Sequence, residues 1–166
     1  CMFSGKTTEL IKEYNRHKAC GIRCCFVNHI TDDRYGSGTT ITKTHNQNSI
    51  TNDKSCKKLT DVLWECENYD AFFINEGQFF DDLYEGVNYL VNMQNKKVYV
   101  CGLDGDFQRR EFGSILKILP LCDDVVKLKA ICKSCKIRDG IFTFRLSNDK
   151  EQMLVGTDNY TALCRS

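Results

Sequence analysis

The sequence predicts an α/β protein in which a parallel sheet with flanking helices is followed by a small β unit. Short, continuous apolar runs alternate with helical patterns as far as Pro120, and this alternation is typical of parallel βαβ units. Beyond Pro120 the helical patterns stop, and β-type runs surround a closely spaced pair of cysteines. We therefore expect a first domain over residues 1–129 and a second over residues 130–166.

The composition is that of a globular protein without a large nucleic-acid or membrane surface. The 166 residues suffice for one full core and a small appendage, with 42% hydrophobic and 27% charged residues. The net charge of +1 argues against a large nucleic-acid footprint, and neither a signal peptide nor a membrane-spanning run is visible. Several of the eleven cysteines lie in or beside apolar segments, which favours a reducing compartment, so we expect a cytoplasmic location.

The first residues match the end of a P-loop, the phosphate-binding pattern G-x-x-x-x-G-K-[ST], without its first glycine. The matching run and its neighbour are Phe3, Ser4, Gly5, Lys6, Thr7 and Thr8. Gly5 lets the backbone turn its N–H groups toward phosphate oxygens, Lys6 neutralises phosphate charge, and the Thr7 hydroxyl holds Mg²⁺. A P-loop joins a strand to a helix, so we expect a strand before Cys1. The motif is short, and an ordinary loop ahead of an amphipathic helix is the alternative.

The spacing of apolar residues predicts the elements that follow. Helical spacing marks residues 7–19, 59–66 and 84–93, whereas continuous apolar runs predict strands at 22–29, 71–74 and 97–103. A polar loop over residues 31–48 is long enough that we expect it to be functional. In parallel sheets, ligands bind at the carboxyl ends of the strands. The P-loop, Asn75 with Glu76, and Leu103 with Asp104 are therefore expected to meet at one edge.

The cysteines of the last segment predict a zinc site. Cys132 and Cys135 have the spacing of a metal knuckle, and Cys164 supplies a third thiolate for a tetrahedral Zn²⁺ ion. We expect the fourth ligand to be a cysteine just beyond Ser166. A redox-active pair is the alternative, but such pairs begin a helix, whereas this one follows a strand. The strands expected in this segment are residues 125–131 and a hairpin of 141–146 with 152–155.

Taken together, these motifs resemble the type II thymidine kinases of animals, bacteria and large DNA viruses. The matching positions keep the family's order over essentially the whole chain. They are residues 2–10, Asp33-Arg34-Tyr35, Thr44-His45, Glu76-Gly77-Gln78-Phe79-Phe80, Leu103-Asp104-Gly105, Phe107-Gln108-Arg109, Val126-Lys127-Leu128, the cysteine pair and Tyr160. The combination of Glu-Gly-Gln-Phe-Phe with Leu-Asp-Gly-x-Phe-Gln-Arg is specific to this family.

The resemblance implies a kinase that transfers the γ-phosphate of ATP to the 5′-hydroxyl of thymidine or deoxyuridine with the help of Mg²⁺. Glu76 aligns with the general base for that hydroxyl. Arg34 matches an arginine near the reacting phosphate, and Asp32 matches the acid close to it. Asn75 and Gln78 fall on the nucleotide side of the site, together with the P-loop residues.

The resemblance also implies which residues enclose the nucleoside. The positions around the base and its methyl group are Met2, Leu103, Thr143, Tyr160, Phe79, Phe107 and Phe112, with Val155 and Gly156 in a loop that the family uses as a lasso. From the sequence alone, Phe107 and Phe112 would be assigned to the core. In the family the lasso is stapled by structural zinc, and the enzyme is a homotetramer inhibited by thymidine triphosphate. We expect the same here, without a nucleic-acid or membrane partner.

The chain departs from the family pattern at three places. Asn75 replaces the Walker B aspartate, Val155 replaces the first of two lasso glycines, and residues 135–143 form a slightly longer segment than expected. Two alternative functions remain open. One is a P-loop ATPase or nucleic-acid-handling protein that binds through a zinc ribbon, which the near-neutral charge disfavours. The other is a nucleoside-binding protein with weakened catalysis, which Asn75 makes plausible.

Overall fold

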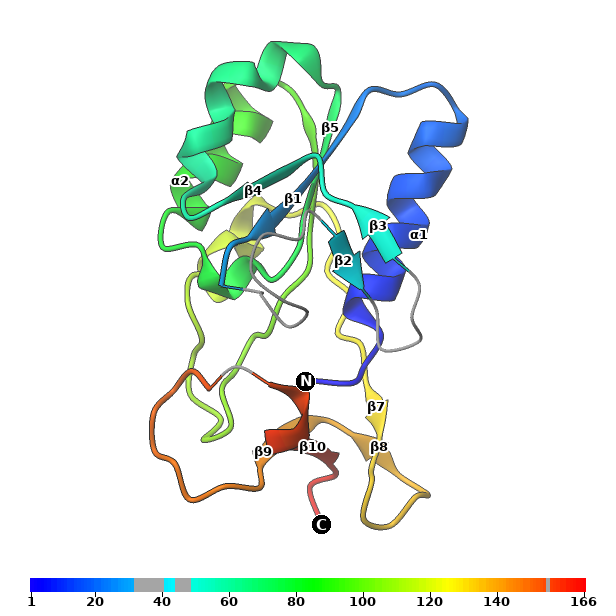
Figure 1. Ribbon diagram of the computed structural model, residues 1–166, viewed down its shortest axis with the longest axis vertical. Helices are drawn as coiled ribbons and strands as arrows, with labels where there is room; N and C mark the ends of the chain where they lie inside the picture. The colour runs from blue at the N-terminus through cyan, green and yellow to red at the C-terminus, as the bar shows by residue number, and fades with distance from the viewer. Residues whose placement is uncertain (32–40, 44–48, 155) are drawn as a thin grey trace.

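The computed structural model describes residues 1–31, 41–43, 49–154 and 156–166. At its centre lies a four-stranded sheet in the order β4-β1-β5-β6, formed by Lys54–Cys56, Cys24–His29, Ala71–Ile74 and Lys97–Val100 (Figure 1). The strands are parallel, with Cys24 opposite Ala71 and Ala71 opposite Lys97. The parallel α/β sheet expected from the sequence is confirmed.

Helices cover both faces of the sheet, which explains why β5 is a continuous apolar run and why β1 is apolar as far as Val27. On one face, α1 (Lys6–Ala19) packs Leu10, Ile11 and Tyr14 against the strands. The Tyr14 ring meets the rings of Phe26 and Phe73 edge-on, with centroids 5.5 and 5.3 Å apart. Since the helix predicted at residues 7–19 is the one that follows the Gly-Lys-Thr loop, this packing fixes the loop to the sheet.

The opposite face carries shorter helices. They are the 3₁₀-helices η1 (Leu59–Asn68) and η4 (Leu116–Leu121), the α-helix α2 (Leu83–Asn88) and the π-helical turn η3 (Tyr89–Met93). Leu59, Leu83 and Leu90 from three of these helices are fully buried in one cluster with Phe72 of β5. The predicted helices at 59–66 and 84–93 are therefore present, although neither is a regular α-helix throughout. In the part of the chain that the structure describes, no helix is both long and apolar enough to cross a membrane.

The C-terminal part consists of short antiparallel pairs. β7 (Ala130–Ile131) pairs with β8 (Asp139–Gly140), and β9 (Phe142–Arg145) pairs with β10 (Tyr160–Leu163), which follows the 3₁₀-turn η5 (Thr157–Asn159). Two predictions are wrong here. Residues 125–129 form no strand, and the partner of β9 is β10 rather than residues 152–155. β10 is preferred because Ala162 packs with Cys1 and Ala130 in a small apolar cluster.

The region of the predicted polar loop contains a further antiparallel pair, β2 (Ile41–Lys43) with β3 (Ser49–Thr51). No strand was predicted there from the amino-acid pattern. Its predicted site residues, Asp32 and Arg34, lie outside the described residues, as does His45.

Candidate active site

The Gly-Lys-Thr loop turns sharply into α1. Phe3 and Gly5 both have left-handed backbones, with φ of 62° and 80°, and the Gly5 carbonyl accepts the first helical hydrogen bond from Glu9 N–H at 3.0 Å. Gly5 meets the positive φ without strain because it has no Cβ. Lys6 donates from Nζ to the Cys1 carbonyl at 2.7 Å, so its ammonium lies folded against the loop. The loop and the start of the helix thus present a cation and several N–H groups on one side, the arrangement that binds anions.

The end of β5 lies beside this loop. The Thr7 hydroxyl donates to Asn75 Oδ1 at 3.1 Å, and the Cys101 thiol donates to the same oxygen at 3.1 Å. Asn75 is fully buried, and its Nδ2 donates to Asn28 Oδ1 at 2.9 Å. The side-chain oxygen of Asn75 therefore faces Thr7 of the loop, while its side-chain NH₂ group donates to Asn28 of the neighbouring strand β1.

The backbone reverses at the next residue, Glu76, whose φ of 51° is left-handed. This turn lets two consecutive side chains serve the same edge of the sheet, which straight strand geometry forbids. Glu76 Oε2 accepts a hydrogen bond from Gln78 Nε2 at 2.6 Å, and Gln78 Oε1 accepts one from Leu103 N–H at 2.9 Å. A Cβ on Gly102 would lie 2.6 Å from Gln78 Oε1, so a larger residue there would displace the Gln78 amide from this position. The loop and the two strand ends that were predicted to meet at one edge of the sheet do meet there.

A single pocket spans the loop, the strand ends and the C-terminal part. Of the predicted site residues, the pocket is lined by Met2, Phe3, Gly5, Lys6, Thr7, Thr8, Glu76, Gln78, Phe79, Leu103, Phe107, Phe112, Gly156 and Tyr160. Phe79 and Phe112 meet edge-on with centroids 5.8 Å apart. Phe107 and Phe112 are half-buried at this wall rather than in the core, contrary to the assignment from sequence alone.

The remaining predicted residues stand outside the lining. Asn75 lies behind the pocket, and Thr143 is buried behind Met2, whose N–H donates to the Thr143 hydroxyl at 3.0 Å. The Ser4 hydroxyl donates to the Cys1 carbonyl at 2.8 Å. Asp32, Arg34 and Val155 lie outside the described residues.

Sequence reasoning missed part of the wall. The additional lining residues are Thr31, Asp106, Gln152, Met153 and Leu154. Asp106 directly follows the Leu-Asp-Gly motif, and this adjacency could have identified it as a site residue. Burial raises the pKa of Asp106, but hydrogen bonds from Arg110 N–H and the Gln152 amide outweigh it and hold the pKa below its usual range. Residues 152–154 were predicted to be a strand, and no pattern in the sequence identifies them as part of the site.

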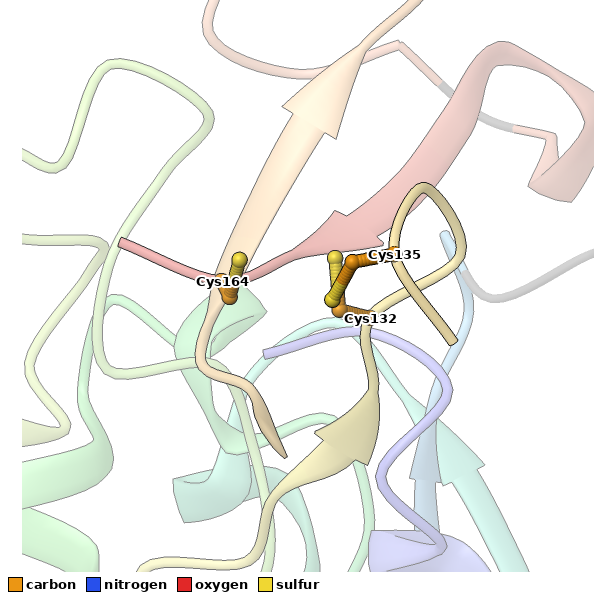
Figure 2. A group of neighbouring side chains, drawn as sticks. All are labelled: Cys132, Cys135 and Cys164. Carbon is orange, nitrogen blue, oxygen red and sulfur yellow. The ribbon is translucent and has the colours of Figure 1, made fainter. Parts of the chain in front are cut away.

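The three cysteines of the predicted zinc site come together at the base of the C-terminal part. Figure 2 shows Cys132 and Cys135 on the turn between β7 and β8, facing Cys164 at the end of β10. Their sulfur atoms all lie within 4.8 Å of one another. Backbone N–H groups of Cys135 and Cys164 lower the pKa of Cys132 to about 6, which favours the thiolate. Three converging sulfurs with one favoured as thiolate fit a Zn²⁺ ion.

Comparisons with known proteins agree with this geometry. The family model described as thymidine kinase matches residues 1–166. The thymidine kinase of Sheeppox virus (strain KS-1) is 39% identical over 167 residues, covering 99% of this chain and 90% of the relative. The cytosolic thymidine kinase of Gallus gallus is 40% identical over 166 residues, covering 99% of this chain and 72% of the relative. Over its full described length, therefore, the chain belongs to the thymidine kinase family.

Proposed function

We propose that the protein transfers the γ-phosphate of ATP to the 5′-hydroxyl of thymidine, and also of deoxyuridine. One observation carries the proposal: a single pocket is lined by Lys6 and Thr7 of the phosphate loop, by Glu76, and by the aromatic side chains of Phe79, Phe107 and Phe112. The names of the relatives, viral and cytosolic thymidine kinases, support thymidine as the substrate. The protein therefore acts as a phosphotransferase of nucleoside salvage.

At the loop end, the backbone of residues 3–8 and the Lys6 ammonium bind the ATP phosphates. Thr7 and Asn75 are the residues suited to hold Mg²⁺, because their oxygens lie 3.1 Å apart beside the phosphate loop. Bound there, Mg²⁺ neutralises charge on the phosphates. Asn75 is buried behind the pocket and supplies an uncharged oxygen, so toward a bound cation it would act as an oriented dipole through water. Gln78 keeps the strand ends together by bonding both Glu76 and Leu103.

At the centre, Glu76 accepts the proton of the nucleoside 5′-hydroxyl. The freed oxygen forms a bond to the γ-phosphorus, the bond from that phosphorus to the β–γ bridging oxygen breaks, and ADP leaves. Positioning contributes most of such catalysis, because the transferred phosphoryl group needs alignment more than covalent help. By the family resemblance, Arg34 assists at the reacting phosphate and Asp32 lies near it.

At the far end, the base lies among apolar groups. Leu103, Phe79, Phe107, Phe112, Met2 and Tyr160 surround a space suited to a pyrimidine, with Thr143 bonded to the backbone of Met2. By the family resemblance, main-chain groups of the lasso pair with the edge of the base. Deoxycytidine is rejected because its exocyclic amine presents a donor where thymidine presents an acceptor.

The C-terminal residues 130–166 act as a zinc-stapled lasso domain on the kinase domain of residues 1–129. Cys132, Cys135 and Cys164 hold the structural Zn²⁺, which adds no chemistry to the transfer. The cytosolic relatives support a cytoplasmic location. Assembly as a homotetramer and inhibition by thymidine triphosphate follow from the family resemblance.

The test is a transfer assay with ATP labelled at the γ-phosphate, Mg²⁺ and a panel of nucleosides. Thymidine and deoxyuridine should become labelled, whereas deoxycytidine, deoxyadenosine and guanosine should not. A thermal shift with thymidine belongs beside the assay. Stabilisation by thymidine without any transfer would replace the proposal by a nucleoside-binding protein with weakened catalysis, the outcome that Asn75 favours. Efficient labelling of deoxycytidine or deoxyadenosine would contradict the assignment of the base pocket.

A further inference from the structure

The connection between β9 and β10 contributes one wall of the pocket without forming a helix or strand over residues 146–154, here called the strap. In Figure 1 the strap is the orange segment that runs beside the yellow-green loop preceding η4. Its backbone is tied down near its start, where Leu146 N–H donates to the Asn159 carbonyl at 2.8 Å. Side chains therefore decide where the rest of the strap lies.

The first of these side chains is Arg145, at the end of β9. Its guanidinium is buried and donates to the strap carbonyls of Asp149 at 3.2 Å, Glu151 and Gln152 at 3.1 Å. It also donates to the Tyr160 hydroxyl and lies 3.8 Å from the centroid of the Phe107 ring. Within the described residues no carboxylate forms an ion pair with Arg145. Its two terminal amino groups thus gather strap carbonyls from the side away from solvent, whereas its buried Nε has no hydrogen-bond partner among the described residues.

The Tyr160 hydroxyl binds the end of the strap, because it donates to the Leu154 carbonyl at 3.0 Å. Tyr160 also lines the pocket. The strap is consequently anchored to the same tyrosine that is predicted to contact the nucleoside.

The second side chain is Gln152, which reaches across to the loop after β6. Its Nε2 donates to Asp106 Oδ2 at 2.9 Å and to the Glu111 carbonyl at 3.2 Å, so both of its N–H bonds are used. The Asp106 side chain is fully buried and is fixed independently by the N–H groups of Gln108 and Arg110, at 2.8 and 2.9 Å. Gln152 and Asp106 both line the pocket. One hydrogen-bonded pair therefore joins two walls that are far apart in the sequence.

We propose that Gln152 is a positioning residue for the nucleoside. It acts as a clasp, meaning that its hydrogen bond to Asp106 fastens the strap across the pocket, while Arg145 binds the strap carbonyls from the buried side. The strap then lies over the pocket before any nucleoside arrives. A loop that is already in its bound conformation binds more tightly, because less conformational entropy is lost on binding. The effect on nucleoside affinity rests on the proposed kinase function, whereas the fastening of the strap does not.

The test compares Gln152→Ala with the wild type, first without ligand. Hydrogen exchange of a peptide covering the strap should become faster in Gln152→Ala. The KM for thymidine should rise roughly tenfold, the size expected for one charge-assisted hydrogen bond, while the KM for ATP and kcat stay near the wild-type values. Gln152→Lys should restore both readouts, because its ammonium can pair with Asp106. Lys150→Ala, an exposed change within the strap, is the matched control and should alter neither.

Two results would overturn the proposal. If ligand-free exchange of the strap is the same in Gln152→Ala and the wild type, Gln152 does not fasten it. If exchange becomes faster but the KM for thymidine is unchanged, the strap does not position the nucleoside. A wild-type protein that labels no thymidine would refute the proposed function instead, and the exchange measurement would still decide whether the clasp exists.

Discussion

Asn75 brings a neutral amide to the position beside the Thr7 hydroxyl, and its two ends have different partners. The oxygen faces Thr7 and Cys101, whereas the nitrogen donates to Asn28. The sequence could place Asn75 and Glu76 at a strand end, and the alternation of side chains required a turn there, which the φ of 51° at Glu76 supplies. It could not supply Asn28 as a partner, because that contact depends on which strands are neighbours.

Asn75→Asp tests the role of this neutral oxygen. A carboxylate restores a charge beside the cation, so the Mg²⁺ concentration for half-maximal activity should fall and kcat should stay equal or rise. Without Mg²⁺, the buried charge meets Asn28 Oδ1, and the free energy of unfolding should drop by about 1–3 kcal/mol. A Mg²⁺ titration of activity and denaturant unfolding with and without Mg²⁺ measure the two effects. Loss of activity in a folded Asn75→Asp protein would mean that Asn75 has a role other than holding the cation.

Glu76→Gln tests the general base. The substitution keeps the shape and an oxygen that can accept from Gln78, but it removes the proton acceptor. We expect kcat to fall by roughly 10²–10⁴, with thymidine affinity largely retained. Steady-state kinetics and equilibrium binding of thymidine check the two parts, with Glu85→Gln on the exposed side of α2 as control. Turnover near that of the wild type would exclude Glu76 as the base.

At the scale of elements, buried parallel strands were predictable and the C-terminal pairing was not. β1 and β5 are buried on both faces, so β5 and the first four residues of β1 are apolar runs that can be recognised without knowing which strands are neighbours. The choice between residues 152–155 and β10 as the partner of β9 depends instead on long-range packing of Ala162 with Cys1 and Ala130. Residues 152–154 are therefore part of the strap and not of a strand, which explains why Gln152 was missed as part of the site.

The zinc site is the second prediction at this scale. Because Cys132, Cys135 and Cys164 join the β7–β8 turn to the end of β10, the metal should hold these elements together. Metal analysis should give one zinc per chain. Removing it with a strong chelator should lower the melting temperature and weaken thymidine binding more than ATP binding, since the loop at Lys6 is attached to α1. Cys164→Ser should lower the melting temperature in the same way. Cys20→Ser, at the exposed end of α1, is its control and should leave the melting temperature unchanged. Purified protein without zinc would refute the site.

At the scale of the molecule, function depends on one pocket that continues from the carboxyl edge of the sheet to the C-terminal pairs. Two of the residues that line it, Lys6 and Tyr160, are almost the whole chain apart in sequence. The sequence predicted both ends through separate motifs. Their continuity follows only from the three-dimensional contact of Met2 with Thr143 and of Gln152 with Asp106.

The most direct test of this continuity is inhibition by a bisubstrate analogue in which thymidine and adenosine are joined through a tetraphosphate. If donor and acceptor share one pocket, the analogue occupies both ends at once. It should then compete with thymidine and with ATP, and bind more tightly than either nucleoside half alone. Competition with only one substrate, or affinity no better than that of thymidine, would contradict a single pocket in which Glu76 stands between the two.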